Sequence, residues 1–259
     1  MLRARHSGAV LGVVFLLGIS GCVTLPPNSK RSPQDPWESW NRGVYRVNDK
    51  LDRAVLKPVA KTYVRAVPAP ARTGISNVLS NLKMTTVMIN DGLQGKFRAA
   101  AVDLARFALN LTVGFGGLLD PATQAGLARN DEEFGQTLGV WGVPAGPFLE
   151  LPFLGPSDVR DGPARIVDFF TGPLHYTRNA EVGWGIFGMG LVDLRADLLT
   201  LEPTLNTVYD PYAFIRDAYL QRRAYLISDG KVSDEPLEDP GADDSPAAAP
   251  PTAPPSKPE

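Results

Sequence analysis

Serine and histidine side chains that could build a hydrolase are few in this chain. Residues 74–77 (Gly-Ile-Ser-Asn) and 155–158 (Gly-Pro-Ser-Asp) each begin like the Gly-x-Ser turn that exposes a nucleophile in lipid hydrolases. In both runs valine stands where the closing glycine belongs, and no expected strand precedes either. Ser157 with His175 is the sharpest enzymatic hypothesis, a lipid hydrolase. Ser157 is better suited to N-cap a helix over 158–170.

Other motifs for cofactors and metals are equally weak. Residues 183–188 match Gly-x-Gly-x-x-Gly, but no βαβ unit surrounds them. Residues 91–96 resemble a phosphate loop, except that Phe97 replaces the required Ser or Thr. The single Cys and two His exclude a Cys/His zinc site, and the acidic run 131–133 lacks metal-binding or glycosidase context. We therefore expect no enzyme, no catalytic residues, no metal and no cofactor.

The only cysteine, Cys22, follows a segment typical of exported proteins. Arg3 and Arg5 precede the uncharged run 8–19, which is shorter than the roughly 20 residues that span a bilayer. Residues 19–22 (Ile-Ser-Gly-Cys) fit a bacterial lipobox, in which the cysteine becomes the acylated first residue. A plain secreted protein with a stray cysteine is the alternative. No Asp follows Cys22, so we expect lipid anchoring at the outer membrane, on its periplasmic side.

These features predict four segments. Residues 1–21 form a lipoprotein signal peptide, 22–34 a lipidated linker, and 35–230 the folded domain. Residues 231–259 are rich in proline, alanine and acids, which predicts a disordered tail. The formal net charge of −2 argues against a nucleic-acid binder.

Helical periodicity dominates the folded domain and predicts an all-α fold. Asp35 should N-cap a first helix with Pro36 at its first position, and Pro58 should end or kink it. Asp210 should cap a last helix that Gly230 stops. Apolar stripes predict the remaining helices over 72–90, 96–112, 158–170 and 190–200.

Three connecting segments are unusually apolar for loops: 107–119, 134–156 and 182–192. Each is broken by glycine or proline, and none is long and regular enough to span a bilayer as a helix. They indicate either a surface that faces lipid or an apolar cavity, or a buried, loop-rich core.

Ordered motifs along residues 35–230 closely resemble the MlaA (VacJ) family of outer-membrane lipoproteins; the match is weaker over 172–208. Among the motifs are 35–42 (Asp-Pro-Trp-Glu-x-x-Asn-Arg), 90–96 (Asn-Asp-Gly-Leu-Gln-Gly-Lys), 116–122 (Gly-Gly-Leu-Leu-Asp-Pro-Ala), 134–139 (Phe-Gly-Gln-Thr-Leu-Gly), 151–157 (Leu-Pro-x-x-Gly-Pro-Ser), 160–161 (Arg-Asp) and 210–219 (Asp-Pro-Tyr-x-x-x-Arg-Asp-Ala-Tyr).

The resemblance implies a single ring-like helical domain lying in the inner leaflet of the outer membrane, with a central amphipathic channel. Mislocalised phospholipids would leave the outer leaflet through it to an MlaC-like periplasmic carrier, which maintains lipid asymmetry. A trimeric porin would be a partner. A structural, porin-associated lipoprotein without transport remains an alternative, as does the serine hydrolase.

Two sets of residues are candidates for the channel. The first contains amides that could line a headgroup path: Asn77, Asn81, Asn90, Gln94 and Asn110. The second lies on the glycine-flanked stem of a polar-tipped segment, expected to be a hairpin that swings as a gate. Its channel-side residues are Phe115, Leu118 and Leu119.

Overall fold

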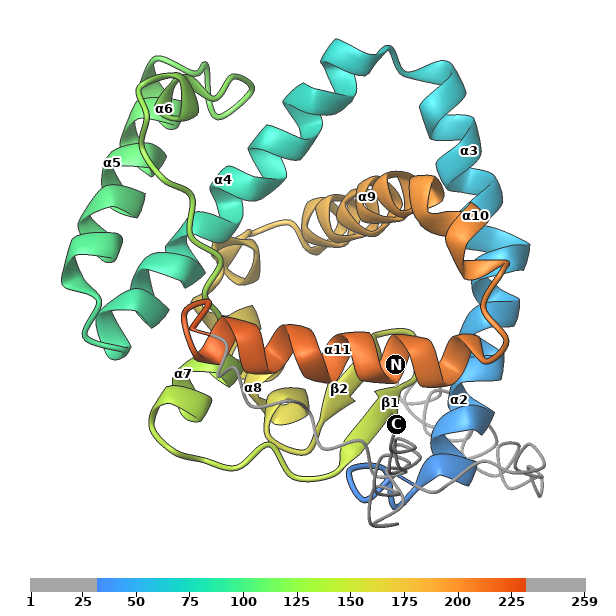
Figure 1. The fold of residues 1–259 in the computed structure, drawn as a ribbon. Coiled ribbons are helices and arrows are strands. Elements are labelled where there is room, and N and C mark those ends of the chain that lie inside the picture. Colours follow the sequence, from blue (N-terminus) through green and yellow to red (C-terminus); the bar gives the residue numbers. More distant parts are fainter. Residues whose placement is uncertain (1–31, 232–259) are drawn as a thin grey trace, which may run out of the picture.

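The computed structural model describes residues 32–231 (Figure 1). Cys22, the signal peptide, most of the 22–34 linker and the tail from 232 lie outside the described residues. The longer helices are α2 (Glu38–Leu51), α3 (Lys57–Ala66), α4 (Ala69–Leu93), α5 (Phe97–Thr112), α8 (Asp161–Thr171), α9 (Ala180–Leu198) and α11 (Pro211–Ile227). The shorter helical elements are η1 (Asp52–Leu56), α6 (Pro121–Gln124), α7 (Phe134–Val140), η2 (Pro173–Tyr176), η3 (Leu199–Leu201) and α10 (Glu202–Leu205).

The first helix continues through Pro58 instead of ending there. Between α2 and α3 the π-helical turn η1 widens the chain, and the Lys57 N–H donates to the carbonyl of Asp52, five residues back. Pro58 can sit directly after this turn because its missing N–H falls where the α-helical ladder is already interrupted. Of the two outcomes expected at Pro58, an end or a kink, the helix does not end there; its irregularity is the π-helical turn η1, directly before Lys57.

Asp35 does not cap this helix, contrary to expectation. The helix begins at Glu38 after Trp37, without a side-chain cap. Asp35 is buried, and its carboxylate accepts hydrogen bonds from the Asn41 side chain and the Tyr212 hydroxyl. Asp35 therefore makes tertiary contacts, although the local sequence predicted that it would cap the helix.

Two other helix starts differ from expectation. Helix α9 begins at Ala180, ten residues earlier than expected, and it includes the glycine-rich run 183–190. Asn179 caps it by accepting the Glu181 N–H. Helix α8 begins at Asp161, since residues 155–158 form a strand, so Ser157 is not its N-cap.

That strand, β2 (Gly155–Asp158), pairs antiparallel with β1 (Phe148–Leu151) in a hairpin that the sequence analysis did not expect. Phe148 lies opposite Asp158, is fully buried, and packs edge-on against the rings of Tyr212 and Tyr219 from α11. The predicted all-α fold is thus correct apart from one small hairpin.

The helices outline a ring in Figure 1, where α4, α3, α2 and α11 follow its edge and α9 lies across the space within it. Helix α9 contacts α3 and α4, while α11 contacts α7 and β2. Helix α11 has the two ends that the sequence predicts. The Asp210 carboxylate caps its start by accepting the Ala213 N–H, and Gly230 follows its end with φ +76°. The β1–β2 hairpin and α7 therefore connect the last helix to the rest of the ring.

Candidate functional site

The distribution of side chains is inverted relative to an ordinary water-soluble domain. Many of the largest apolar side chains are exposed, including Phe97 (74%), Phe115 (76%) and Trp184 (71%). Charged side chains such as Arg106 and Asp161 are buried. Large exposed apolar areas mark surfaces that meet a membrane, a ligand or a partner.

The three apolar connecting segments supply much of this surface. Their exposed members are Leu111, Val113, Phe115, Leu118, Leu119, Val140, Trp141, Val143, Phe153, Leu154, Val182, Trp184, Phe187 and Met189. Phe148 is the clear exception, since it is fully buried. The alternative of a buried, loop-rich core therefore does not describe these segments. Over residues 32–231, no helix combines the length and the hydropathy that crossing a bilayer would take.

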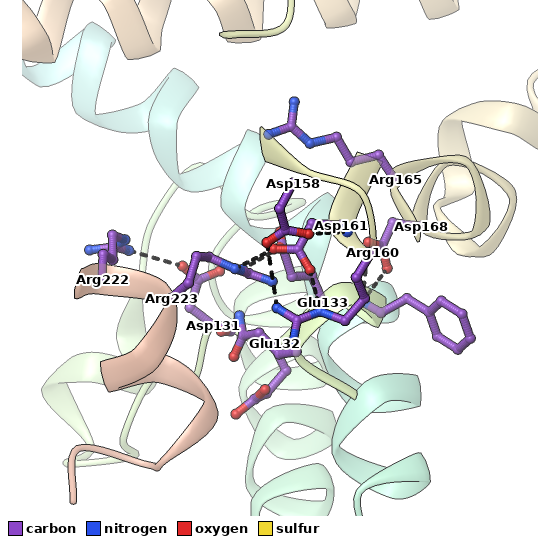
Figure 2. Close-up of polar contacts among 12 residues, drawn as sticks. Asp131, Glu132, Glu133, Asp158, Arg160, Asp161, Arg165, Asp168, Arg222 and Arg223 are labelled. Atoms are coloured by element: carbon purple, nitrogen blue, oxygen red, sulfur yellow. Dashed lines mark hydrogen bonds and ion pairs between the residues drawn. The ribbon is translucent and has the colours of Figure 1, made fainter. Parts of the chain in front are cut away.

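A buried ionic cluster joins β2, α7, α8 and α11 beneath this surface. Figure 2 shows Arg160 and Arg223 converging on Asp161. The Asp161 carboxylate lies 2.8 Å from Arg160 Nε and 2.6 Å from Arg223 Nε, and it accepts the Tyr219 hydroxyl at 2.7 Å. Arg223 also pairs with Glu133, the residue before α7.

The electrostatics of this cluster follow from its burial. Burial alone would raise the pKa of Asp161, but the Arg160 hydrogen bond, the Arg223 charge and the Tyr219 hydroxyl hold it below its usual range. Burial raises the pKa of Asp158 to about 6, with the Asp161 carboxylate adding to the effect. The ion pairs of Asp161 with Arg160 and Arg223, and of Arg223 with Glu133, hold α8, α11 and the start of α7 together.

A second polar group ties α5 to the segment that follows it. Arg106 Nη2 donates to Asp120 at 3.0 Å and its Nη1 donates to the carbonyl of Leu127. The Asn110 amide donates to Asp120 and accepts the Ala122 N–H. These bonds fix both ends of α6 against α5.

The channel-lining candidates fall into two separate groups. Asn77, Asn81 and Asn110 surround a polar cavity of about 10 Å³ between α4, α5 and the turn after α5, which is room for about one water. Asn90 and Gln94 lie further along α4, where both bond the Thr137 hydroxyl of α7.

Their amides are largely occupied by the protein itself. Asn77 donates to the Leu118 carbonyl, Asn90 to Asp168, and Gln94 to Glu132. Asn81 Oδ1 is buried without a hydrogen-bond partner. These residues therefore position the segments around α4, and a lining role stays a prediction.

The gate candidates Phe115, Leu118 and Leu119 are exposed on a tight turn after α5. Phe115, Gly116 and Gly117 all have positive φ, and a Cβ on Gly114 would lie 2.3 Å from the Asn110 carbonyl oxygen. Glycine is therefore required at this turn.

The expected free, polar-tipped hairpin is not what the structure contains. The segment after the turn includes α6, and its polar side chains are bonded: Arg129 to Ser80, Asn130 to Asp103, and Asp131 to Lys83. The Ser80 hydroxyl and the Lys83 ammonium on α4 and the Asp103 carboxylate on α5 hold the tip in place. Any swing is thereby confined to the apolar turn 114–119.

The hydrolase candidates are not assembled. Ser157 is fully buried in β2 and its hydroxyl has no hydrogen-bond partner. His175 lies in η2, where its ring packs edge-on against Phe169, Phe170 and Tyr176. Within residues 32–231, no three His, Cys, Asp or Glu side chains gather as metal ligands.

A fold of ring-forming helices with an ion-paired interior and an apolar exterior defines a helical protein suited to apolar surroundings. The chain belongs to the MlaA lipoprotein family, whose sequence model matches residues 33–226. The resemblance drawn from the motifs is thus confirmed.

Two relatives of the same name match over almost their whole length. The chain is 36% identical over 247 residues to the intermembrane phospholipid transport system lipoprotein MlaA of Escherichia coli strain K12, covering 93% of this chain and 95% of that protein. Against the protein of the same name from Haemophilus influenzae the identity is 32%, covering 89% and 94%.

A solved structure, from work on the structural basis for maintenance of bacterial outer membrane lipid asymmetry, has the same fold. It superposes with a TM-score of 0.66 at 37% identity, covering 76% of this chain and all of that chain.

Proposed function

We propose that the protein is an outer-membrane lipoprotein that passes mislocalised phospholipids from the outer leaflet to an MlaC-like periplasmic carrier and so maintains lipid asymmetry. The ring would lie in the inner leaflet, anchored through acylated Cys22 and seated against a trimeric porin. The names of the relatives support a role in phospholipid transport between membranes.

The observation that carries this proposal is the inverted distribution of side chains. Exposed apolar side chains on α5, α8 and α9 suit contact with acyl chains, whereas buried arginine–carboxylate clusters hold the ring together beside a small apolar core that includes Phe148. A path lined by the ring would need to lower only the barrier for moving a polar headgroup through an apolar layer. Such a path requires no chemical step.

The turn 114–119 would gate this path. Its apolar side chains face solvent while its backbone is held to α4 only by the Asn77–Leu118 bond among the hydrogen bonds described here. A small rearrangement of the turn would move Phe115 and Leu118 without breaking the Arg106–Asp120 pair behind it.

The deciding experiment compares a deletion strain with strains complemented by the wild type. Intact cells are treated with a membrane-impermeant amine reagent that labels outer-leaflet phosphatidylethanolamine. Deletion should raise the labelled fraction and wild-type protein should restore it. Equal labelling in all strains would overturn the proposal.

A second measurement separates transport from a structural role and from hydrolysis. Proteoliposomes containing the purified lipoprotein and labelled phospholipid are mixed with the soluble carrier. Transport predicts faster transfer of intact lipid to the carrier. No transfer either with or without porin would favour the structural alternative, and release of lysolipid or fatty acid that Ser157→Ala abolishes would favour the hydrolase.

A further inference from the structure

One face of the long bent helix carries a row of basic side chains at four-residue intervals. Arg53 in η1 and Lys57, Lys61 and Arg65 in α3 line a groove of about 360 Å³ together with Pro58 and Thr62. Residues four apart lie one above another on a helix, so these cations form one continuous stripe. We call it the basic groove.

Half of this charge is not neutralised within the protein. Arg53 pairs with Asp49 and Lys57 pairs with Glu202. Lys61 and Arg65 are exposed, and neither has an acidic partner within 4.0 Å among residues 32–231. The groove therefore offers two free cations beside two partly neutralised ones.

The groove points away from the interior of the ring. Ala60 and Tyr63 are the buried residues of α3, and the Tyr63 hydroxyl donates to Asp193 of α9. Lys61, Thr62 and Arg65 are exposed on the rest of the helix. A ligand in the basic groove would thus reach the protein from outside.

The same helical stretch also exposes apolar side chains. Val55 and Val59 are 53% and 45% exposed. Each stands two residues from a cation of the row, which places it on the other side of the helix. A row of Lys and Arg on one side with exposed apolar residues on the other is typical of a helix that lies in the interface of a bilayer, with its cations at headgroup depth.

We infer that the basic groove binds phosphate headgroups of anionic phospholipids in the leaflet beside the protein. The Arg65 guanidinium can donate two parallel hydrogen bonds to phosphate oxygens, and Lys61 supplies a point charge next to it. The inference requires only that the protein lie at a membrane, and it is independent of whether lipid is moved. An acidic protein partner at this groove is the competing outcome.

The test places a benzophenone amino acid in the groove in place of the uncharged Thr62. The full-length lipoprotein is reconstituted in vesicles of phosphatidylethanolamine with a minority of phosphatidylglycerol, irradiated, and analysed by mass spectrometry. The same photoreactive chain is also irradiated in cells, where protein partners are present. We expect lipid adducts in both, with phosphatidylglycerol well above its share of the membrane.

Charge variants decide whether the groove causes that enrichment. Lys61→Gln with Arg65→Gln should lower the phosphatidylglycerol adduct about fivefold per charge removed. Lys61→Arg with Arg65→Lys should retain it. Arg98→Gln with Arg178→Gln, which removes two exposed and unpaired cations elsewhere, is the matched control and should leave it unchanged.

Three results would overturn the inference: adducts that mirror bulk lipid composition, no response to the Lys61 and Arg65 charge variants, or a dominant adduct with an acidic protein in cells. Outer-leaflet labelling in the same strains reports transport separately. A failed transport assay with enriched phosphatidylglycerol adducts would leave the groove intact.

Discussion

The guanidinium of Arg42 forms two parallel hydrogen bonds with the carboxylate of Asp210, at 3.0 Å and 2.6 Å, across 168 positions of sequence. Asp210 is also the N-cap of α11, and Arg42 stacks over the Tyr212 ring with 4.4 Å to its centroid. One side chain of α2 thus holds the start of the last helix and closes the ring at that point.

Arg42→Gln should therefore destabilise the whole ring. The substitution leaves the half-buried Asp210 and buried Glu38 carboxylates without their cation, which costs about 3 kcal/mol in comparable pairs. Thermal unfolding in detergent should show a clearly lower Tm. Arg46→Gln, an exposed cation without an ion pair on the same helix, is the control and should change little.

A buried pair of acids predicts how stability depends on pH. Asp91 in α4 and Asp103 in α5 are both fully buried. Burial and the neighbouring Asp103 carboxyl group raise the pKa of Asp91 from 3.8 to about 8. The folded state then binds more protons than the unfolded state between these values, so Asp91 makes stability fall as pH rises through that window.

Asp91→Asn removes this titration and should flatten the loss of stability between pH 5 and pH 8, which Tm measured across that range will report. The exposed Asp197→Asn is the control. An unchanged slope in the Asp91 variant would mean that other buried acids set the pH dependence.

Gly135 in α7 is predicted to be intolerant of any side chain. A Cβ there would lie 2.6 Å from Asp161 Oδ1 and 2.8 Å from Arg223 Nη2, inside the ionic cluster of Figure 2. Gly135→Ala should destabilise by about 2 kcal/mol, as overpacking does. Gly188→Ala in α9 meets nothing within 4 Å and should stabilise slightly, because alanine favours a helix. Similar Tm values for both variants would contradict the packing seen around Gly135.

The proposed gate can be tested by a reversible cross-link. A Cβ on Gly74 would contact Leu118, at 3.1 Å from its Cδ2 and 3.5 Å from its carbonyl oxygen, so this pair of positions is chosen for the two cysteines. Gly74→Cys with Leu118→Cys should raise outer-leaflet phospholipid under oxidising conditions and recover on reduction. Each single variant should behave alike in both conditions; equal asymmetry in the oxidised and reduced double variant would mean that the turn is no gate.

Lipid anchoring is predicted to depend on Cys22 alone. Mass spectrometry of the membrane-extracted protein should find an acylated N-terminus at Cys22, and Cys22→Ser should abolish processing at that site. An unmodified thiol at position 22, or cleavage elsewhere, would refute the anchor. One acyl chain alone binds membranes only marginally, so the attached chains together with the exposed apolar side chains should make extraction require detergent.

The sequence was informative where local signals agreed with tertiary contacts. Asp210 and Gly230 mark both ends of α11 as expected, since an N-cap and a C-terminal glycine act within one turn. The length of α9 was underestimated because its glycines weaken the intrinsic helix propensity of residues 183–190. Contacts with α3 and α4 override that weak propensity in the folded protein. Four-residue strands carry too little alternation to be detected, so β1 and β2 were missed.

The functional side chains show the same contrast. Arg160 and Asp161 were visible only as a motif, since a dipeptide gives no sign that Arg223, more than sixty positions later, will meet it. Asn77 and the other amides were chosen by residue type, and type alone cannot distinguish a lining amide from one that holds a turn.

The exposed apolar side chains also have a consequence for any stage at which the protein is surrounded by water. Phe97, Phe115 and Trp184 would stand in water throughout any aqueous crossing, at a cost of about 25 cal/mol for each Å² of apolar surface left wet. Folding cannot hide them, because the fold is what places them outside. Under the membrane location proposed above, this apolar surface would have to be covered during transit through water and uncovered at the bilayer.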